Sequence, residues 1–566
     1  MSNHDIVLGI DLGTTYSCVA YVNDHGKPEV LVNDRGDRVT PSVVWFDGKR
    51  VSVGEEAKEM AVLQPTEVAT FIKRHMGDMQ YTFTCSLGSL RPQEVSAYIL
   101  KKLVKDASAA LGREVRDVII TCPAYFFVAE REATKEADRL AGLNVLEILN
   151  EPTAAAISYG FDAVSGQKDK NILVYLGGGT FDVTVISVSA KSIDVVCTDG
   201  DHKLGGKNWD ERIARMLRTK YEAEAGPRDA ELWEKPETIQ ELQRLAEKMK
   251  KTLTVRSEAS ERVALDGEQV VVTVTRVEFE EATYDLLEQT ITFTTKVLET
   301  ARSKNVAAVD EILLVGGSTR MPQVAARVKA ELNMTPRVYD PDEAVAKGAA
   351  MKGYQFRLRE RALSRAREMA ADDGFVLEAT DADEFCLEPS GEALLTKALT
   401  AIAEEEGLPP NAVAAGGRIV RNVCSKSFGE ILRFANGPRL KVHIFRNSTI
   451  PCKTESESAT VADNQTVVKV VVKQCDVDIR EYDKELGADP DLGSVLWEGE
   501  VNLPPGLAAG EPLCDRYSLN ANGMLHVVCE HLPSGRRVET DINVLGTLDP
   551  VEEAEIEARI ASLVID

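Results

Sequence analysis

Two stretches with one plan decide the fold: IVLGIDLGTTYSCVAYV at Ile6–Val22 and NILVYLGGGTFDVTVISV at Asn171–Val188. Each is an apolar strand, a turn of glycine and threonine, and a second apolar strand. A third glycine turn follows a strand in EILLVGGSTRMP at Glu311–Pro322. Glycines at a strand end let the backbone approach a ligand, and successive amide N–H groups can bind phosphate oxygens. A single turn of this kind is typical of any tight hairpin, but two matched copies predict a pair of loops that hold a polyphosphate between them.

The first part of the chain alternates apolar strands with amphipathic helices, which indicates an α/β architecture. Strands are predicted at Ile6–Ile10, Val118–Thr121, Ile172–Tyr175, Asp182–Val188 and Ile312–Val315. Helices are predicted at Pro92–Leu111, Glu130–Ala141, Asp210–Ala225, Pro236–Leu253 and Glu278–Ser303. There is no GxxxxGK[ST] motif, so the predicted nucleotide site is not a P-loop.

The pattern changes after residue 355. Residues 356–417 begin as a charged helical run and end in LPPNAVAAGGR, so we expect a helical and irregular insert. Residues 424–548 are predicted to be all-β, because LKVHIF alternates with period two, TVVKVVV is dense in β-branched residues, and Asn522-Gly523 is a hairpin signal. Residues 549–566 have the periodicity of one short helix.

Composition argues against several classes of function. The 566 residues carry a net charge of -25, which opposes sequence-independent binding to nucleic acid. The ten cysteines form no Cys-x-x-Cys pair, as is usual for buried thiols in a reducing compartment. No basic segment followed by an apolar run opens the chain, and no apolar stretch is long enough to span a bilayer. We therefore expect a cytoplasmic protein that binds neither nucleic acid nor membrane.

Five segments of the first part resemble the signature segments of the DnaK (heat-shock-seventy) ATPase domain. They are GIDLGTTYSCVA, NEPTAAAISYG, LGGGTFDV, LLVGGSTRMP and DPDEAVAKGAA. The resemblance continues in IFRNSTIPCKTESESATVADNQTVV and SLNANGMLHVVCEHLPSG, which are similar to the peptide-binding sandwich of the family. It implies an actin-like, two-lobed ATPase domain over residues 1–355, a linker at 418–423 and a β-sandwich substrate-binding domain over 424–548. The expected function is an ATP-dependent chaperone.

The resemblance also implies a site for ATP or ADP with Mg²⁺. Asp11 corresponds to the acid that holds the metal through water, and Lys73, Glu151, Asp182 and Thr180 correspond to the catalytic residues. Positions that match nucleotide contacts are Gly13, Thr14, Thr15, Tyr16, Gly177, Gly178, Gly179, Thr180, Gly205, Gly206, Glu247, Lys250, Lys251, Thr254, Gly316, Gly317, Ser318, Arg320 and Asp342. Fixed positive charge and a metal near the transferred phosphoryl group are what this chemistry requires.

One residue departs from the family pattern at the metal. The repeat aligns Asp11-Leu12-Gly13 with Tyr175-Leu176-Gly177, and the family has aspartate at the second position as well. A neutral phenol is a poor ligand for Mg²⁺, which prefers charged oxygens. Loss of a positioned acid–base group costs a factor of about 10² to 10⁴, so we expect slow ATP hydrolysis.

Coupling between the domains is implied by two further matches. Pro123 and Arg131 in CPAYFFVAER correspond to the relay between the lobes, and Phe127 and Val128 replace its Asn-Asp pair. In the linker, Asn422 stands in place of an acid. The insert at 356–417 either rests on the ATPase domain or holds a partner.

The sandwich is expected to add an extended, unfolded polypeptide as a strand, with an apolar side chain in a pocket. Val461 and Val468 match pocket-lining positions, and Ile431 and Phe434 lie nearby. Ordinary sandwich core is the alternative for each valine. Ser458 replaces the usual phenylalanine. The short helix at 549–566 is expected in place of the family's long lid, and a J-domain co-chaperone and a nucleotide exchange factor are possible partners.

Two other functions compete with an ATP-dependent chaperone. A non-hydrolysing, ATP-binding co-chaperone, adaptor or exchange factor for another chaperone would fit Tyr175 and the altered linker. A sugar kinase or a filament-forming relative of actin would share the ATPase fold, but neither explains the β domain.

Overall fold

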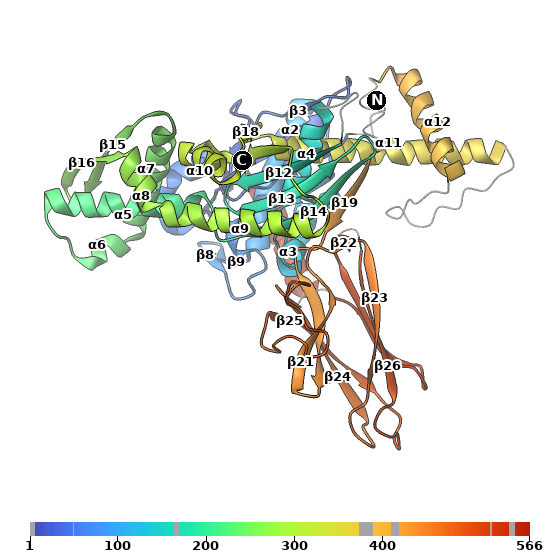
Figure 1. Ribbon diagram of the computed structural model, residues 1–566. Helices are drawn as coiled ribbons and strands as arrows, with labels where there is room; N and C mark the ends of the chain where they lie inside the picture. The colour runs from blue at the N-terminus through green and yellow to red at the C-terminus, as the bar shows by residue number, and fades with distance from the viewer. Residues whose placement is uncertain are drawn as a thin grey trace.

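The computed structural model describes residues 6–48, 50–162, 169–372, 389–408, 418–520, 523–542 and 550–566. An α/β domain with two lobes carries a β-sandwich that projects from one side (Figure 1). The predicted fold class is confirmed. Within the described ranges, the helices lack the combination of length and apolar character that a membrane crossing needs.

The first lobe contains a sheet with the strand order β11-β10-β1-β2-β3. The first glycine–threonine turn joins β1 (Leu8–Asp11) to β2 (Tyr16–Val22), and β1 pairs in parallel with β10. Leu8 and Ile10 of β1 are buried in one apolar cluster with side chains of α2 and α3. The other elements are β3 (Pro28–Val30), β10 (Asp117–Cys122), β11 (Asn144–Asn150), α2 (Pro92–Leu111) and α3 (Val128–Leu140).

The second lobe repeats this plan in a larger sheet with the order β18-β17-β12-β13-β14-β19-β22. The second glycine turn joins β12 (Lys170–Gly177) to β13 (Phe181–Val188), and the third follows β17 (Glu311–Val315). The single helix predicted at 278–303 is two helices, because the backbone of Thr283 between them (φ −118°, ψ 8°) departs from helical angles. The other elements are α5 (Gly206–Ala225), α7 (Pro236–Val255), α8 (Arg276–Ala282), α9 (Tyr284–Ser303), β14 (Ser192–Asp201) and β18 (Arg337–Val338).

Two helices fill the space between the sheets, α4 (Glu151–Asp162) and α11 (Ala344–Asp372). They cross so closely at Gly348 that a Cβ there would lie 1.8 Å from the Ala154 carbonyl oxygen. Any side chain at this position would push the helices apart. The glycine therefore brings Glu151, at the start of α4, close to both lobes.

The predicted boundary at residue 355 falls inside α11, which continues without interruption to Asp372. Ala362 and Ala366 of this extension are buried against α12 (Pro389–Glu406), whose Leu395 and Leu399 lie in the same cluster. The described part of the insert is therefore a helical pair, in which α12 packs on the extension of α11 that projects from the ATPase domain (Figure 1). Residues 373–388 and 409–417 of the insert lie outside the described residues.

The predicted linker forms a strand, β19 (Ile419–Val423), that pairs in parallel with β14 and extends the sheet of the second lobe. The sandwich that follows has two sheets, with the orders β21-β20-β24-β25 and β23-β26-β27-β28. The strands are β20 (Ser427–Phe434), β21 (Gly437–Ile444), β22 (Thr449–Ile450), β23 (Cys452–Ala459), β24 (Val467–Cys475), β25 (Ser494–Asn502), β26 (Pro512–Leu519), β27 (Leu525–His531) and β28 (Arg536–Asp541). The hairpin between β26 and β27 is present, although Asn522 lies outside the described residues.

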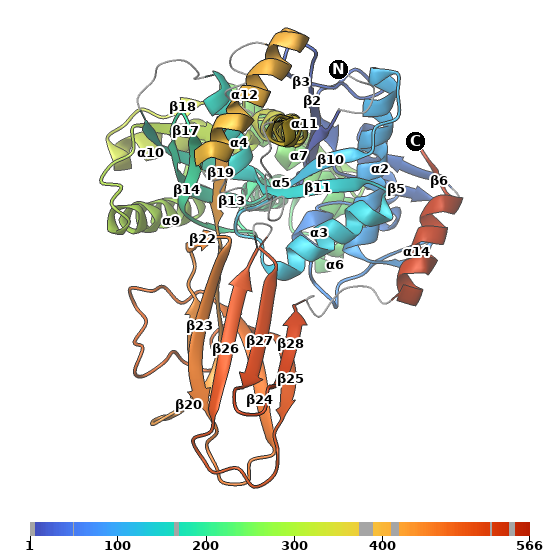
Figure 2. The same ribbon diagram turned by 90° about the vertical axis from the view of Figure 1, so that its right-hand side faces the viewer.

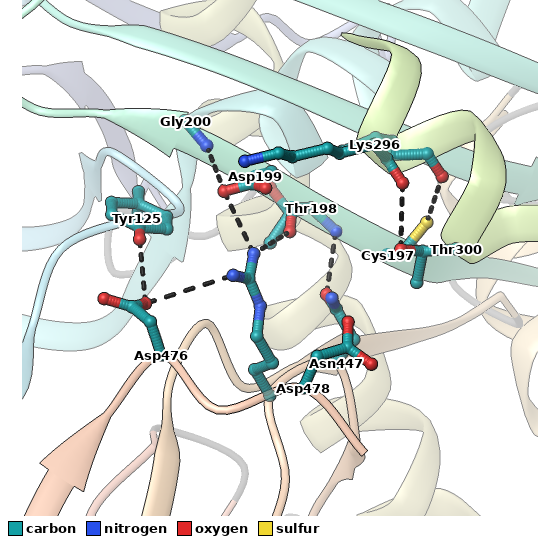
Figure 3. A network of polar contacts seen from close by, with 12 residues as sticks. Tyr125, Cys197, Thr198, Asp199, Gly200, Lys296, Thr300, Asn447, Asp476 and Asp478 are labelled. Atoms are coloured by element: carbon teal, nitrogen blue, oxygen red, sulfur yellow. Dashed lines mark hydrogen bonds and ion pairs between the residues drawn. The ribbon is translucent and has the colours of Figure 1, made fainter. Parts of the chain in front are cut away.

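The sandwich is docked on the ATPase domain through polar contacts. Lys426 lies 3.8 Å from the centre of the Tyr125 ring and 2.5 Å from Asp476. The Tyr125 hydroxyl donates to the same carboxylate at 2.8 Å (Figure 3). Arg446 pairs with Asp199 at 3.0 Å, and both side chains are nearly buried. Breaking such a pair on one side only is costly, because it leaves a buried charge without a partner.

The C-terminal segment packs on the first lobe. Helix α14 (Pro550–Ser562) lies beside α2 and α3 on the first lobe, away from the far end of the sandwich (Figure 2). Ile556 and Ile560, one turn apart, are buried in the core of that lobe with 2% exposure each. Strand β29 (Val564–Ile565) then extends β6 (Arg50–Val53) in parallel. The apolar stripe of this short helix is buried against the first lobe.

Candidate nucleotide site

A cavity of about 500 Å³ lies between the lobes, where the three glycine turns meet. Its size is within the range of about 300–1,000 Å³ that is usual for small-molecule sites. The predicted residues that line it are Asp11, Gly13, Thr14, Thr15, Tyr16, Lys73, Glu151, Gly178, Gly179, Thr180, Gly206, Glu247, Lys250, Lys251, Thr254, Gly316, Gly317, Ser318, Arg320 and Asp342.

Three of the predicted residues do not line this cavity. Gly177 and Gly205 face a smaller neighbouring cavity, and Asp182 lies behind the second turn. Sequence reasoning missed five apolar wall residues: Val39, Leu176, Met321, Pro341 and Val345. Four of them lie inside the segments that resemble the family: Leu176, Met321, Pro341 and Val345. Their position next to the glycine turns could have identified them as wall residues.

The first two glycine turns face each other at close range. A Cβ at Gly179 would lie 2.1 Å from the Cβ of Thr14, so only glycine fits at this position. Gly178, by contrast, faces open space. The Gly178 amide donates to the Thr180 carbonyl at 3.1 Å inside the turn, while Thr14, Thr15 and Thr180 place hydroxyl groups on the cavity wall. This cradle of donors fits a polyphosphate.

Lys73 and Glu151 form a buried ion pair at the phosphate end of the cavity, with 2.6 Å between Nζ and Oε1. Lys73 lies in the 3₁₀ turn Ile72–His75 of the first lobe, and Glu151 begins α4. Burial alone would lower the pKa of Lys73, but the Glu151 and Asp11 carboxylates outweigh it and raise the pKa. Lys73 therefore holds a fixed positive charge where a terminal phosphate would lie.

Two more carboxyl groups lie near this pair. Burial, together with the nearby Glu151 carboxylate, raises the pKa of Asp11 to about 7 and that of Asp182 to about 8. Asp182 accepts a hydrogen bond from the backbone N–H of Tyr125 at 3.1 Å, while its second oxygen has no hydrogen-bond partner within the described structure. Positive charge brought by a ligand or metal would favour the ionised forms of both acids.

Mg²⁺ fits this arrangement when it is shared with phosphate oxygens. The ion usually keeps several waters and takes one or two carboxylates, and Asp11 on the cavity wall is suited to that role. Across the described ranges, no three His, Cys, Asp or Glu side chains converge closely enough to hold a metal by themselves. The residues present therefore suit a metal that arrives with its nucleotide.

The opposite end of the cavity is closed by an ion network between the lobes. Glu247 of the second lobe pairs with Lys58 of the first lobe and with its own neighbour Lys251, each at 2.7 Å. The Tyr16 hydroxyl donates to Glu247 at 3.1 Å. Burial opposes ionisation of Glu247, but the two lysines dominate and lower its pKa to about 2. The network ties the lobes together over the cavity.

The four residues predicted to line a peptide pocket are not brought together. Val468 contributes to the core between the sheets, whereas Ile431 packs in a separate cluster with Leu440 and Tyr482. Val461 is 57% exposed in the turn after β23, and the ring of Phe434 lies against Gly487. The four side chains have different surroundings, so the described part of the sandwich does not bring them together in one pocket.

Polar side chains lie between the two sheets instead. Glu430 and His443, both buried, are 2.8 Å apart. Ser458, which stands where the family has phenylalanine, donates to Asp515 at 2.7 Å. These contacts make the sandwich interior polar around Ser458.

The three predicted coupling residues lie near the interface of the two domains. Arg131 donates to Asn150 at 2.6 Å and shares a small cavity with Asn422. Asn422 accepts a hydrogen bond from the Thr153 hydroxyl at 2.9 Å. Pro123 is two residues before Tyr125, which contacts the sandwich. Arg131 and Asn422 thus lie where the ATPase domain meets the strand that leads into the sandwich.

Asp182→Asn is expected to raise the melting temperature of the nucleotide-free protein more at pH 8 than at pH 5. The pKa of Asp182 is raised to about 8 from an ordinary value of 3.8, so the folded state keeps a proton that the unfolded state has lost. Stability is therefore lost as pH rises through this window, by about 1.4 kcal/mol per pH unit. Asparagine cannot ionise. Equal differences in melting temperature from wild type at both pH values would contradict this account.

Known proteins match the part of the chain that holds the cavity. The family model for Hsp70 protein matches residues 7–357. Two curated relatives, both named Chaperone protein DnaK and both from strains of Halobacterium salinarum, are 42% identical over 355 residues. These matches cover 61% of this chain and 55% of each relative, so the chain spans about half the length of the curated relatives it matches.

Proposed function

Because the chain belongs to the Hsp70 family, we propose that it is an ATP-dependent molecular chaperone that binds unfolded polypeptide segments and cleaves ATP slowly. The observation that carries the proposal is the buried Lys73–Glu151 pair, which lies beside two glycine–threonine loops in a cavity of suitable size. Unfolded polypeptide, a J-domain co-chaperone and a nucleotide exchange factor are the proposed partners.

The chain's own residues perform three tasks in this proposal. Bound ATP supplies the transferable phosphoryl group, and its Mg²⁺ supplies charge neutralisation. Backbone amides and threonine hydroxyls of the two loops orient the phosphates, and Glu151 holds the Lys73 ammonium in place. Lys73 stabilises negative charge that develops on the terminal phosphate. Asp11, on the cavity wall, would hold the magnesium ion through water.

Slow cleavage is attributed to Tyr175. Its ring is buried in the second lobe against Phe181, with 4.8 Å between ring centres, and its hydroxyl donates to Thr290 at 2.6 Å. It faces the small neighbouring cavity, away from the nucleotide cavity. The position that repeats Asp11 therefore supplies no carboxylate to the metal or the attacking water.

Tyr175→Asp is expected to speed single-turnover cleavage of ATP by about tenfold or more, toward the 10² to 10⁴ that a positioned acid–base group contributes. It should also lower stability by about 3 kcal/mol or more, because the short aspartate turns toward the nucleotide cavity and leaves the space of the Tyr175 ring empty in the second lobe. Rapid-quench kinetics and thermal melting measure the two effects.

The matched control is Tyr175→Asn, which creates the same cavity without the charge and should destabilise without a gain in rate. Tyr175→Phe removes only the hydrogen bond to Thr290 and should cost about 1 kcal/mol with unchanged kinetics. Equal cleavage rates in the Asp and Asn variants would show that the missing carboxylate does not limit the rate.

Polypeptide binding is proposed at the sandwich edge. Strand β23 ends its sheet, and its side chains alternate between half-buried and exposed, which suits the addition of an extended strand. The direct test measures binding of a fluorescent unfolded peptide in ADP and in ATP, together with the effect of the peptide on ATP cleavage. Tighter binding in ADP and faster cleavage with peptide support the chaperone. ATP binding with no response to peptide favours the adaptor or exchange-factor alternative.

A further inference from the structure

A second cavity of about 80 Å³ adjoins the nucleotide cavity at the first phosphate loop. The two cavities share Thr14, Thr15, Glu247 and Lys250 as wall residues. Its volume is far below the roughly 300 Å³ of a site for a drug-sized ligand. The space therefore suits a small ion next to the phosphate loop, and not a second nucleotide.

Among the lysines around this second cavity, Lys58 and Lys250 form ion pairs and Lys207 does not, within the described residues. Lys58 pairs with Glu247 and Lys250 pairs with Asp210, at 2.7 and 2.8 Å. Lys207 also lines the cavity, and within the described part of the chain it has no carboxylate within ion-pair distance. Burial and the nearby Arg74 guanidinium lower the pKa of Lys207, although the Glu211 carboxylate, which also lines the cavity, opposes part of this shift. An anion beside Lys207 would relieve this unfavourable environment.

The wall beside Lys207 is a contact between the lobes. The Lys207 ammonium, from α5 of the second lobe, lies 4.6 Å from the centre of the Phe71 ring of the first lobe. Phe71 has a left-handed backbone (φ 56°) and leads into the turn that carries Lys73 and Arg74. Arg74 donates to the carbonyl of Gly179 in the second phosphate loop at 3.0 Å. The segment that closes this cavity is thus tied to both the catalytic lysine and the phosphate loop.

We propose that the second cavity receives inorganic phosphate as it leaves the nucleotide cavity, with Lys207 as its cation and the Phe71–Lys207 contact as its closure. The inference rests on the proposed ATP-binding function and adds an exit for one product. Phosphate can pass from the Thr14–Thr15 loop to Lys207 while the Glu247 network still holds the lobes together over the nucleotide.

Free phosphate enters the same path in reverse, so binding of inorganic phosphate to the ADP-loaded full chain tests the proposal. Lys207→Ala is expected to weaken phosphate binding about tenfold, the size of one lost hydrogen bond to a charged group, and to leave ADP affinity unchanged. Lys203→Ala removes the same charge from an exposed position four residues away and should change neither affinity. Phosphate is titrated by equilibrium dialysis, and ADP by calorimetry.

Phe71→Ala provides a second readout. It should leave phosphate affinity within a few-fold of wild type and speed phosphate dissociation about two- to fivefold, as expected from loss of one partly exposed cation–π contact. The inference would be overturned if Lys207→Ala did not change the phosphate affinity, or if Lys203→Ala lowered it by the same factor. The proposed function would stand in either case. A wild-type chain that binds no ADP would overturn the proposed function and the exit path with it.

Discussion

Lys73→Ala is expected to slow single-turnover cleavage of ATP by about 10² to 10³-fold, the usual effect of removing one group that stabilises transition-state charge. ATP should still bind, because the loops and the ion network around Glu247 do not depend on Lys73. Rapid-quench kinetics on protein loaded with Mg·ATP measures the rate, and calorimetry measures the affinity.

A double variant distinguishes lost catalysis from damage to the site. Lys73→Ala leaves Glu151 buried without its cation, which can cost about 3–5 kcal/mol. Glu151→Gln in addition removes that unpaired charge and should restore most of the stability without restoring cleavage. Recovery of the rate in the double variant would show that Lys73 acts only by neutralising Glu151.

Replacing Ile556 and Ile560 by alanine is expected to detach the C-terminal segment from the first lobe. Each isoleucine is buried to 2% exposure, and truncation of such a side chain costs about 2–5 kcal/mol. Strand β29 would leave with the helix, so β6 would lose the Asp566 carbonyl that accepts from the Val53 amide. Hydrogen exchange of residues 50–53 and 550–566 should therefore accelerate together.

The control for this experiment is Glu555→Ala on the exposed face of the same helix, which should change exchange little. An ion pair also attaches the C-terminal segment to the first lobe. Arg559 pairs with the fully buried Glu94 at 2.8 Å, and burial raises the pKa of Glu94 to about 7. If β6 stays protected from hydrogen exchange in the double isoleucine variant, the Arg559–Glu94 ion pair and strand β29 hold the segment without its apolar stripe.

The nucleotide cavity was largely predictable because its constraints are local. Glycine turns are visible in sequence, and the contact between Gly179 and Thr14 leaves no room for another residue. The side-chain direction of Tyr175 was not predictable in the same way. Its ring leaves the cavity because Phe181 and Thr290 offer a buried apolar site and a hydrogen-bond partner, and Thr290 is 115 residues away in sequence.

The C-terminal helix and the sandwich show where sequence reasoning fails. The spacing of Ile556 and Ile560 indicates that one face is buried but not which surface covers it. In the sandwich, a shift of one position in a strand moves a side chain to the other face. Ile431 and Val468 therefore lie in different clusters although family positions suggested one pocket.

The most direct test of the account is single-turnover cleavage of Mg·ATP by the wild-type chain, followed by acid quench and nucleotide chromatography. Slow but complete conversion of bound ATP to ADP, lost in Lys73→Ala and accelerated in Tyr175→Asp, is the predicted result. ATP that stays bound and uncleaved by wild type over hours would contradict it, and the cavity would then serve nucleotide binding without hydrolysis.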